Sequence, residues 1–166
     1  LRGEFMDDVY TSFKKALTDA YDNKLIGNNV LKTDFSIEIH DLIGAGAYIV
    51  GEETAMLESI EGKKGFPRFK PPFPAVKGLF GAPTIINNVE TLASVPKIME
   101  NGSEWFKSAG TKDSPGFKCF SVSGHVNKPG NYEIPLGTPF KELLKLAGGM
   151  KNGKKIKAVI PGGSSV

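Results

Sequence analysis

A glycine-rich stretch that contains Gly44, Gly46 and Gly51 runs directly into two carboxylates, Glu52 and Glu53. Small side chains let the backbone approach a ligand closely, and a glycine-rich turn that opens a helix leaves backbone N–H groups free for a phosphate. Two carboxylates instead suit hydroxyl and amide donors, such as a ribose or a carboxamide. The glycine spacing matches neither the dinucleotide fingerprint nor the P-loop. The stretch is therefore either a cofactor loop or a close-packed corner between a helix and a strand.

Residues 66–74 hold four prolines, three phenylalanines and two cations, Arg68 and Lys70. Such a run cannot be helical, because each proline lacks an N–H donor and restricts the residue before it. We therefore predict a stiff extended loop. Its rings either plug a core, as most buried aromatic residues do, or form a ligand lid in which they stack on a heterocycle while a cation meets a phosphate. Both interpretations stay open, since the cations of the loop suit the acidic pair Glu52 and Glu53.

Two side-chain amides, Asn87 and Asn88, precede a segment with helical character. We expect an asparagine cap followed by a helix that Pro96 interrupts or restarts and that ends at Gly102. Asparagine is a common N-cap, so a plain cap is the simpler interpretation. The alternative is that one of the two amides also binds the polar edge of a ligand.

The elements that must position these residues follow from the spacing of apolar side chains. Apolar residues at helical spacing predict an amphipathic helix over residues 6–25, and alternation predicts a half-buried strand over residues 35–40. A second helix is expected over residues 52–61, closed by Gly62. This order favours an α/β layer with a parallel sheet, in which ligands gather at the carboxyl ends of the strands.

A second unit is expected after the third helix. The pattern predicts a hairpin over residues 117–134, then a helix with Thr138 as its N-cap, then a strand over residues 156–160. Cys119 lies in an apolar run of the hairpin, so we expect a buried structural thiol. The order is typical of the opening of a β-grasp module. No residue pattern in it indicates chemistry, so a binding or docking role is favoured.

The composition limits the classes of protein to which the chain can belong. It has 166 residues, of which 40% are hydrophobic, and a net charge of +3 with basic residues scattered among acidic ones. These values allow a core and do not indicate nucleic-acid binding. One cysteine and two distant histidines, His40 and His125, give neither a disulfide framework nor a metal site. No apolar run could span a bilayer and no signal peptide is evident, so we expect a soluble intracellular protein, and its two ends suggest a piece of a longer one.

Three blocks of sequence stand in a fixed order: GAGAYIVGEETA at 44–55, RFKPPFPA at 68–75 and PTIINNVETL at 83–92. Together they closely resemble the family of flavin-bearing, NADH-oxidising subunits of respiratory complex I, which is the F subunit of bacterial NADH:quinone oxidoreductase. The resemblance extends through essentially the whole chain and includes IPGGSS at 160–165. Three ordered motifs with this spacing are far more specific than any one of them.

The resemblance implies a fold of the α/β class. Residues 1–108 would form the later part of a Rossmann-like FMN and NADH domain. Residues 109–166 would form an incomplete ubiquitin-like β-grasp domain of the SLBB type. The chain would then be an internal fragment of that longer protein.

The resemblance also implies roles for individual residues. The positions that match the FMN side are Tyr48, Gly51, Glu52, Glu53, Asn87 and Asn88. The positions that match the NADH side are Glu53, Lys70 and Phe73, with Phe73 stacking on the adenine side. Val50 stands where this family usually has a cysteine, and we expect binding to survive that change because the two side chains are similar in bulk.

The implied reaction is hydride transfer from NADH to FMN, after which electrons pass singly to iron–sulfur clusters. No protein side chain then has a catalytic role of its own, and the ligands of the family's 4Fe-4S cluster would lie outside this chain. The implied partners are a thioredoxin-like 2Fe-2S subunit and a large iron–sulfur subunit of a quinone-reducing complex. The protein would be cytoplasmic and peripheral, held at the cytoplasmic face of the inner membrane through that complex.

Two other functions share these sequence features. One is the flavin subunit of a soluble NAD-linked hydrogenase or formate dehydrogenase, and the other is a non-catalytic β-grasp binding module whose glycine-rich half is scaffold. The resemblance places the family's upstream flavin loop before Leu1 and its four cluster cysteines after Val166. We therefore expect the chain alone to be inactive and to bind FMN or NADH weakly or not at all, and submicromolar affinity in a flavin titration would contradict this.

Overall fold

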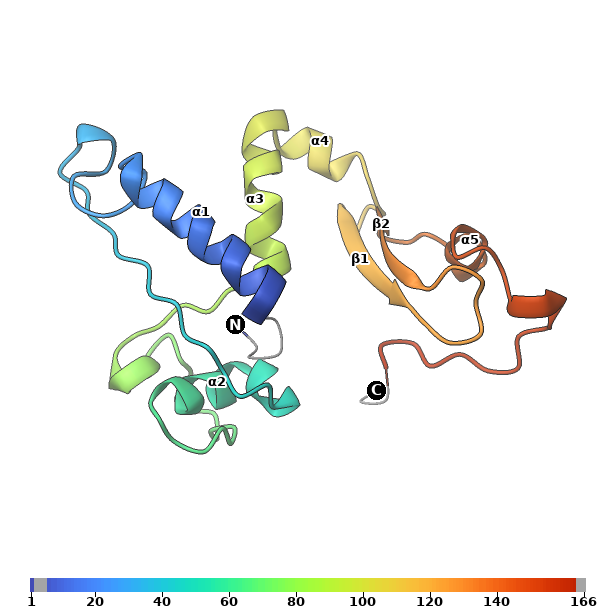
Figure 1. The fold of residues 1–166 in the computed structure, drawn as a ribbon, viewed down its shortest axis with the longest axis horizontal. Coiled ribbons are helices and arrows are strands. Elements are labelled where there is room, and N and C mark those ends of the chain that lie inside the picture. Colours follow the sequence, from blue (N-terminus) through green and yellow to red (C-terminus); the bar gives the residue numbers. More distant parts are fainter. Residues whose placement is uncertain (2–5, 164–166) are drawn as a thin grey trace. The chain divides into compact units, whose positions relative to one another are not determined.

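The structure is a computed structural model that describes residue 1 and residues 6–163. The chain divides into two compact units, Leu1–Asn87 and Asn88–Val166, and each is described by itself. The helices are α1 (Thr11–Asp22), α2 (Glu53–Ile60), α3 (Val89–Asn101), α4 (Ser103–Lys107) and α5 (Phe140–Leu146), and the strands are β1 (Phe117–Val122) and β2 (Gly130–Pro135), as labelled in Figure 1. Short helical turns occupy Met6–Tyr10, Val30–Lys32, Tyr48–Gly51, Leu79–Gly81 and Lys151–Gly153.

Helix α1 confirms the amphipathic helix predicted near the start of the chain. A π-helical turn leads into it, and the helix ends at Asp22, three residues earlier than the apolar pattern suggested. Two side chains connect it to the segment that follows: Lys14 forms an ion pair of 2.9 Å with Asp41, and the Tyr21 hydroxyl accepts the Ile39 N–H. These contacts hold an extended segment along the helix.

The strand predicted over residues 35–40 is wrong. A strand needs a neighbour that pairs with its backbone N–H and C=O groups along its length. In the described part of the N-terminal unit, Ile37 forms an isolated bridge with Gly27 and the Phe35 carbonyl accepts the Val30 N–H, which does not make a ladder. Phe35 and Ile39 are exposed. The alternation was real, but a periodic pattern does not supply a pairing partner. The parallel sheet that it implied is likewise not seen among the described residues, whose sheet is a single antiparallel hairpin.

Helix α2 confirms the second predicted helix and carries the core of the N-terminal unit. Glu52 is its N-cap, and the helix ends before Gly62. Thr54, Ala55 and Leu57 are buried, each 2% exposed or less. These three residues point in different directions from the helix axis, because residues one and two positions apart do not share a face of a helix. The first turn of α2 is therefore enclosed on most sides. Its N-terminus is thereby fixed in place.

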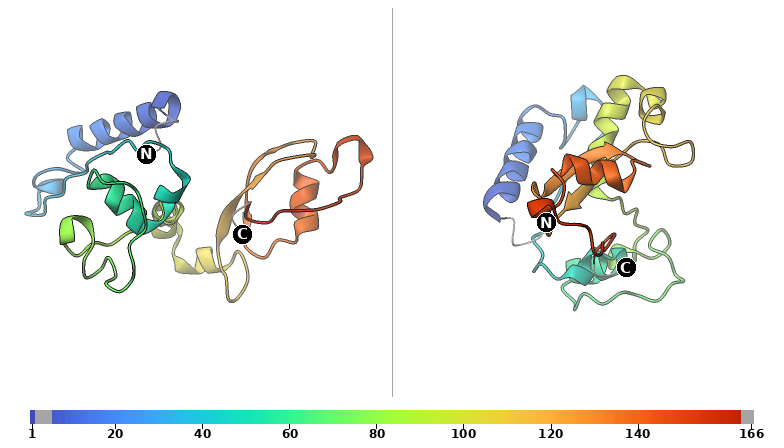
Figure 2. Two further views of the ribbon diagram at one scale, coloured as in Figure 1. Left: turned by 90° about the horizontal axis from the view of Figure 1, so that it is seen from below. Right: turned by 90° about the vertical axis from the view of Figure 1, so that its right-hand side faces the viewer.

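Helix α3 begins the C-terminal unit and runs through Pro96 without a break, although interruption at that residue was predicted. The helix loses one backbone hydrogen bond there, because proline has no N–H. It ends at Asn101, its C-cap Gly102 has φ 85° and ψ 163°, and α4 follows at once. Figure 2 shows the bend between α3 and α4 in two further views.

The predicted hairpin is confirmed as β1 and β2, which pair antiparallel from Phe117 opposite Pro135 to Val122 opposite Gly130. Ile134 is buried, together with Val126 and Ala147 from the segments that follow β1 and α5. These buried apolar side chains form the core of the C-terminal unit.

Three expectations for the C-terminal unit are wrong. Thr138 does not cap α5, since its hydroxyl donates to the Pro135 carbonyl and Pro139 occupies the cap position. Cys119 is exposed, because residue 119 lies on the open face of a two-stranded sheet. Residues 156–160 form no strand, and the side chains of Ile156 and Ile160 are exposed.

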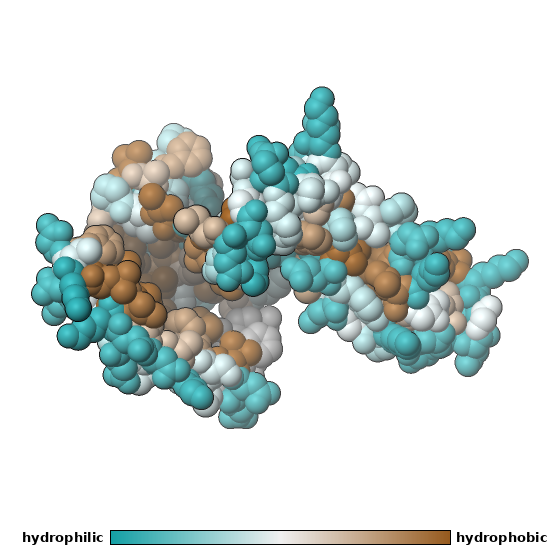
Figure 3. Space-filling view, turned by 90° about the horizontal axis from the view of Figure 1, so that it is seen from above, coloured by the Kyte–Doolittle hydropathy of each residue, from teal (hydrophilic) through white to brown (hydrophobic). Residues whose placement is uncertain are grey.

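Large apolar side chains reach the surface in both units, as the brown areas of Figure 3 show. Contiguous apolar surface on a folded chain usually marks a contact with another chain segment or a partner. Among the described residues, no helix combines the length and the apolar character needed to cross a bilayer.

Candidate functional site

Glu52 closes the N-terminus of α2 with its own side chain. Its carboxylate accepts the backbone N–H groups of Thr54 and Ala55, each at 2.9 Å, and the Thr54 hydroxyl. These hydrogen bonds, led by that of Thr54, lower the pKa of Glu52 to about 2. The free N–H groups that the glycine-rich turn was predicted to offer to a phosphate are therefore already occupied by a carboxylate.

Lys70 joins the proline-rich loop to this end of α2. Its ammonium lies 2.6 Å from the Glu53 carboxylate and 3.1 Å from that of Glu52. Glu53 first, and Glu52 second, raise the pKa of Lys70. All three side chains keep contact with solvent, with Lys70 30% and Glu53 43% exposed. The result is a charged cluster, Glu52–Glu53–Lys70, that an incoming polar ligand can still reach.

The aromatic candidates of the N-terminal unit lie at the surface. Phe73 is 58% exposed and Tyr48 is 79% exposed, so neither fills a core in the described chain. The alternative in which the phenylalanines of the loop plug a core is not supported by Phe69 either, which is 97% exposed. Gly51, between Tyr48 and the charged cluster, faces open space: an added Cβ would meet no atom within 4 Å.

The two asparagines belong to different units. Asn87 is the last residue of the N-terminal unit and its side chain is exposed, whereas Asn88 begins the C-terminal unit. Asn88 acts as the N-cap of α3, where its side-chain oxygen accepts the Glu90 N–H at 2.9 Å. The capping interpretation is therefore confirmed for Asn88. A ligand-binding role for either amide stays a prediction.

Arg68 holds the proline-rich loop to α2, a function that the sequence analysis did not assign. Its guanidinium donates to Glu58, to Glu61 and to the Gly78 carbonyl, and its backbone N–H donates to the Thr54 hydroxyl. Arg68 is 24% exposed and Glu61 only 7%. A signal was present in the sequence, since two glutamates three residues apart share one face of a helix.

Glu61 accepts hydrogen bonds from two donors besides Arg68. Lys63 lies 2.7 Å from one of its oxygens, and the Phe80 N–H donates to the other. Lys63 and Arg68, followed by the Phe80 N–H, lower the pKa of Glu61 to about 2. The network ties together the end of α2, the start of the proline-rich loop and the turn after it.

The groups in the N-terminal unit fit part of the chemistry of a flavin mononucleotide and of NADH. Glu53 can accept hydrogen bonds from ribose hydroxyls or a carboxamide, Lys70 can donate to a phosphate or a hydroxyl, and exposed rings such as Phe73 can stack on a heterocycle. The N-terminus of α2 cannot serve a phosphate while Glu52 caps it. The fit thus covers the rings and sugars, and for a phosphate it offers the Lys70 ammonium and not the backbone N–H groups of α2.

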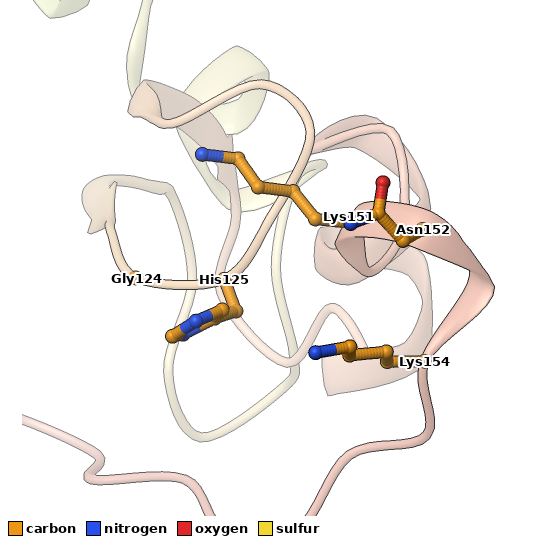
Figure 4. A pocket seen from close by; sticks show the side chains of 5 residues that line it. All are labelled: Gly124, His125, Lys151, Asn152 and Lys154. Atoms are coloured by element: carbon orange, nitrogen blue, oxygen red, sulfur yellow. The ribbon is translucent and has the colours of Figure 1, made fainter.

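A separate cleft of about 470 Å³ lies in the C-terminal unit. Figure 4 shows its lining, which comprises Gly124, His125, Lys151, Asn152 and Lys154. None of the residues predicted to contact FMN or NADH lines it. Within the described part of the chain, no three of the His, Cys, Asp and Glu side chains come together as a metal site would require.

Two family descriptions match the sequence. Residues 4–97 match the Nuo51 FMN-binding domain, and residues 119–166 match the SLBB domain. The order confirms the predicted fold class, a portion of an FMN-binding domain followed by a β-grasp domain of the SLBB type. The boundary expected near residue 108 falls between the two matches and stays a prediction.

Curated relatives and solved structures agree with these matches. The chain is 52% identical over 165 residues to the F subunit of the NADH-quinone oxidoreductase of Mycobacterium tuberculosis H37Rv, and 54% identical over 168 residues to that of Rickettsia bellii. These alignments cover 99% and 100% of this chain but only 37% and 40% of the relatives. An NAD+-reducing [NiFe]-hydrogenase in the H2-reduced state superposes with a TM-score of 0.77 at 39% identity, over 89% of this chain and 24% of that chain. The chain therefore belongs to the Nuo51 FMN-binding domain family, and it spans 37% to 40% of the length of the F subunits that it matches.

Proposed function

We propose that this chain contributes part of the pocket in which an NADH-quinone oxidoreductase transfers hydride from NADH to FMN. The observation that carries the proposal is the Glu52–Glu53–Lys70 cluster, in which the loop and the start of α2 meet at distances of 2.6 and 3.1 Å while remaining open to solvent. The match to the FMN-binding domain family supports the same conclusion.

In this proposal the chain's own residues bind and orient, and none exchanges a proton with the substrate. Glu53 accepts hydrogen bonds from NADH or FMN, Lys70 donates to them, and Phe73 stacks on the adenine side. Tyr48, Gly51, Glu52, Asn87 and Asn88 form the FMN side. When bound, FMN supplies the hydride acceptor and the means of passing electrons onward one at a time. The contribution of the protein is to hold the two rings in contact and to exclude water.

The names of the relatives, which are F subunits of NADH-quinone oxidoreductase, support a proposal for the partners and the location. We propose that the complete protein works with a thioredoxin-like 2Fe-2S subunit and a large iron–sulfur subunit, and that its own 4Fe-4S cluster is bound by residues outside this chain. The complex would hold it at the cytoplasmic face of the membrane.

A second candidate function is supported by one observation, the superposition on an NAD+-reducing [NiFe]-hydrogenase with a TM-score of 0.77. The chain would then belong to the flavin subunit of a soluble NAD-linked hydrogenase or formate dehydrogenase. The proposed roles of Glu53, Lys70 and Phe73 are the same in both. Neighbouring genes for membrane quinone-reducing subunits or for hydrogenase subunits distinguish the two.

The test uses the complete protein that contains this sequence, loaded with FMN. Addition of NADH under anaerobic conditions should bleach the absorbance of the bound flavin, and NADPH at the same concentration is the control for non-specific reduction. A flavin that NADH does not reduce would contradict the proposal. That result would favour the non-catalytic binding module, in which the glycine-rich half is only scaffold.

The chain alone is not equivalent to the complete protein, because it spans 37% to 40% of the length of its curated relatives. We propose that by itself it is inactive and binds FMN or NADH weakly or not at all.

A further inference from the structure

The side chain of Glu90 connects the first turn of α3 to strand β1, across 28 and 29 residues of sequence. One carboxylate oxygen accepts the backbone N–H of Cys119 at 2.9 Å, and the other lies 2.7 Å from the ammonium of Lys118. All of these residues belong to the C-terminal unit. The helix and the hairpin are thus joined by a charged side chain and not only by the chain that runs between them.

The same residue is joined to Asn88 through its backbone. The Glu90 N–H donates to the Asn88 side-chain oxygen at 2.9 Å, which forms the N-cap of α3. The turn Asn88–Val89–Glu90 is therefore held by two separate sets of contacts, one within the cap and one to β1. A movement of the hairpin would act on the turn that carries the Asn88 amide.

The two contacts to β1 are stronger than a surface ion pair alone. The Cys119 N–H first, and Lys118 second, lower the pKa of Glu90. A carboxylate that accepts a backbone N–H forms a charge-assisted hydrogen bond, which is shorter and stronger than a neutral one. In contrast, Glu100 near the other end of α3 forms an ion pair with Lys97, three residues away on the same helix, and both side chains are more than 60% exposed.

We propose that the β1–β2 hairpin positions the flavin-side amide of Asn88, and that Glu90 is the positioning residue through which it does so. This inference rests on the proposed function, because it concerns Asn88 as an FMN-binding residue. It assigns a role to the second domain, in which no residue pattern indicated chemistry of its own. Glu90 does not contact the flavin in this proposal and acts only by holding the first turn of α3 in place.

The experiment compares variants of the complete protein. Glu90→Ala should raise the dissociation constant of FMN about tenfold, measured by flavin fluorescence during titration of the apoprotein, because the turn loses both contacts to β1. Glu90→Gln should show a smaller rise, since its amide oxygen can still accept the Cys119 N–H. The matched control is Glu100→Ala, which removes a glutamate from the same helix and should bind FMN as the wild type does.

A second readout reports on the connection itself. Hydrogen exchange of the Cys119 amide, measured by mass spectrometry or NMR, should be about tenfold faster in Glu90→Ala than in Glu100→Ala, because local opening exposes the amide. If Glu90→Ala fails to fold, Lys118→Ala tests the same connection from β1 and should weaken FMN binding while leaving the Cys119 bond in place.

The outcomes separate this inference from the proposed function. Wild-type-like FMN affinity in Glu90→Ala and Lys118→Ala overturns the inference, whether or not Cys119 exchanges faster, and leaves the proposed function standing. Absence of FMN binding by the wild-type protein overturns both. Weakened FMN binding with faster Cys119 exchange, in Glu90→Ala but not in Glu100→Ala, supports the inference.

Discussion

The ammonium of Lys70 lies 2.6 Å from the carboxylate of Glu53, although the two residues are 17 positions apart in the sequence. The contact joins an extended proline-rich loop to the first residue of α2. Arg68 anchors the same loop two residues earlier, through Glu58 and Glu61 at the other end of the helix. The loop is therefore fixed to α2 through Arg68 and Lys70, while the Glu52–Glu53–Lys70 cluster and Phe73 remain accessible to solvent.

The first prediction concerns this contact. In the complete protein, Lys70→Ala and Glu53→Gln should each lower kcat/KM for NADH about tenfold, because a charged hydrogen bond to the ligand is lost. The effect should appear mainly in KM, since neither group takes part in the transfer itself. Steady-state oxidation of NADH with an artificial electron acceptor measures both parameters.

The matched control for this prediction is Lys77→Ala, which removes an exposed lysine from the same unit. It should leave both kinetic parameters unchanged. Unaltered NADH oxidation in Lys70→Ala and Glu53→Gln would support the view that the glycine-rich half is a scaffold.

The second prediction concerns the pH dependence of stability. The hydrogen bonds of Glu52 lower its pKa from an ordinary value of 4.5 to about 2 in the folded protein. A group whose pKa is lower in the folded state stabilises the fold above its unfolded pKa, and that stabilisation is lost as the pH falls toward the folded pKa. The difference in free energy of unfolding between wild type and Glu52→Gln should therefore be constant above about pH 5 and should shrink between about pH 5 and pH 2.

Chemical denaturation at several pH values measures that difference. Glu61 titrates in the same window, since its pKa is also lowered to about 2, so the comparison with the variant is needed to isolate Glu52. If the difference in free energy of unfolding stays constant across the whole window, then capping of α2 does not lower the pKa of Glu52.

Much of the local structure was predictable from the sequence. The α2 helix, the α3 helix and the hairpin follow from periodicity, from Glu and Asn at the starts of helices and from glycine at their ends. Glu53 and Lys70 both stand in motifs that resemble a known family, and the structure joins them. Local pattern and ordered motifs are both properties of short segments, which a sequence displays directly.

The remaining features depend on contacts between distant segments. Residues 35–40 alternate as a strand does, but the described residues give them only the single bridge at Ile37. The sequence makes Arg68 a candidate phosphate ligand, whereas two glutamates from the end of α2 hold its guanidinium. Pairing of strands and neutralisation of charge need partners from elsewhere, and a single sequence does not say which segments will meet.

The third prediction follows from the Arg68 contacts. Arg68→Ala should lower the Tm of the chain and make the proline-rich loop more sensitive to proteolysis, because Glu58 and Glu61 lose the guanidinium that they share and the Gly78 carbonyl loses a donor. Arg68→Lys should recover only part of the stability, since one ammonium cannot reproduce the planar fork of a guanidinium. Limited proteolysis followed by mass spectrometry locates the opened segment.

The control for Arg68 is Lys63→Ala. Lys63 contacts the same glutamates but is 59% exposed, so its ion pairs are weakened by solvent. Its removal should change Tm much less than Arg68→Ala does. Equal effects of the two variants would show that the Arg68 contacts add nothing beyond charge.

The fourth prediction distinguishes the two neighbouring asparagines. Asn88→Ala should destabilise the C-terminal unit by about 1 kcal/mol, because it removes the N-cap of α3. Asn87→Ala should leave stability unchanged, since Asn87 is exposed and the described side-chain hydrogen bonds include none to it. Denaturant unfolding of the chain measures both effects.

The same pair of variants tests the flavin role separately from the capping role. In the complete protein, both substitutions should weaken FMN binding if both amides contact the flavin, so Asn87→Ala would lose affinity without losing stability. That combination cannot arise from a cap. If FMN affinity falls only in Asn88→Ala, and in proportion to the lost stability, then the asparagine pair acts through the helix alone and the FMN side of the pocket depends on Tyr48, Gly51 and Glu52.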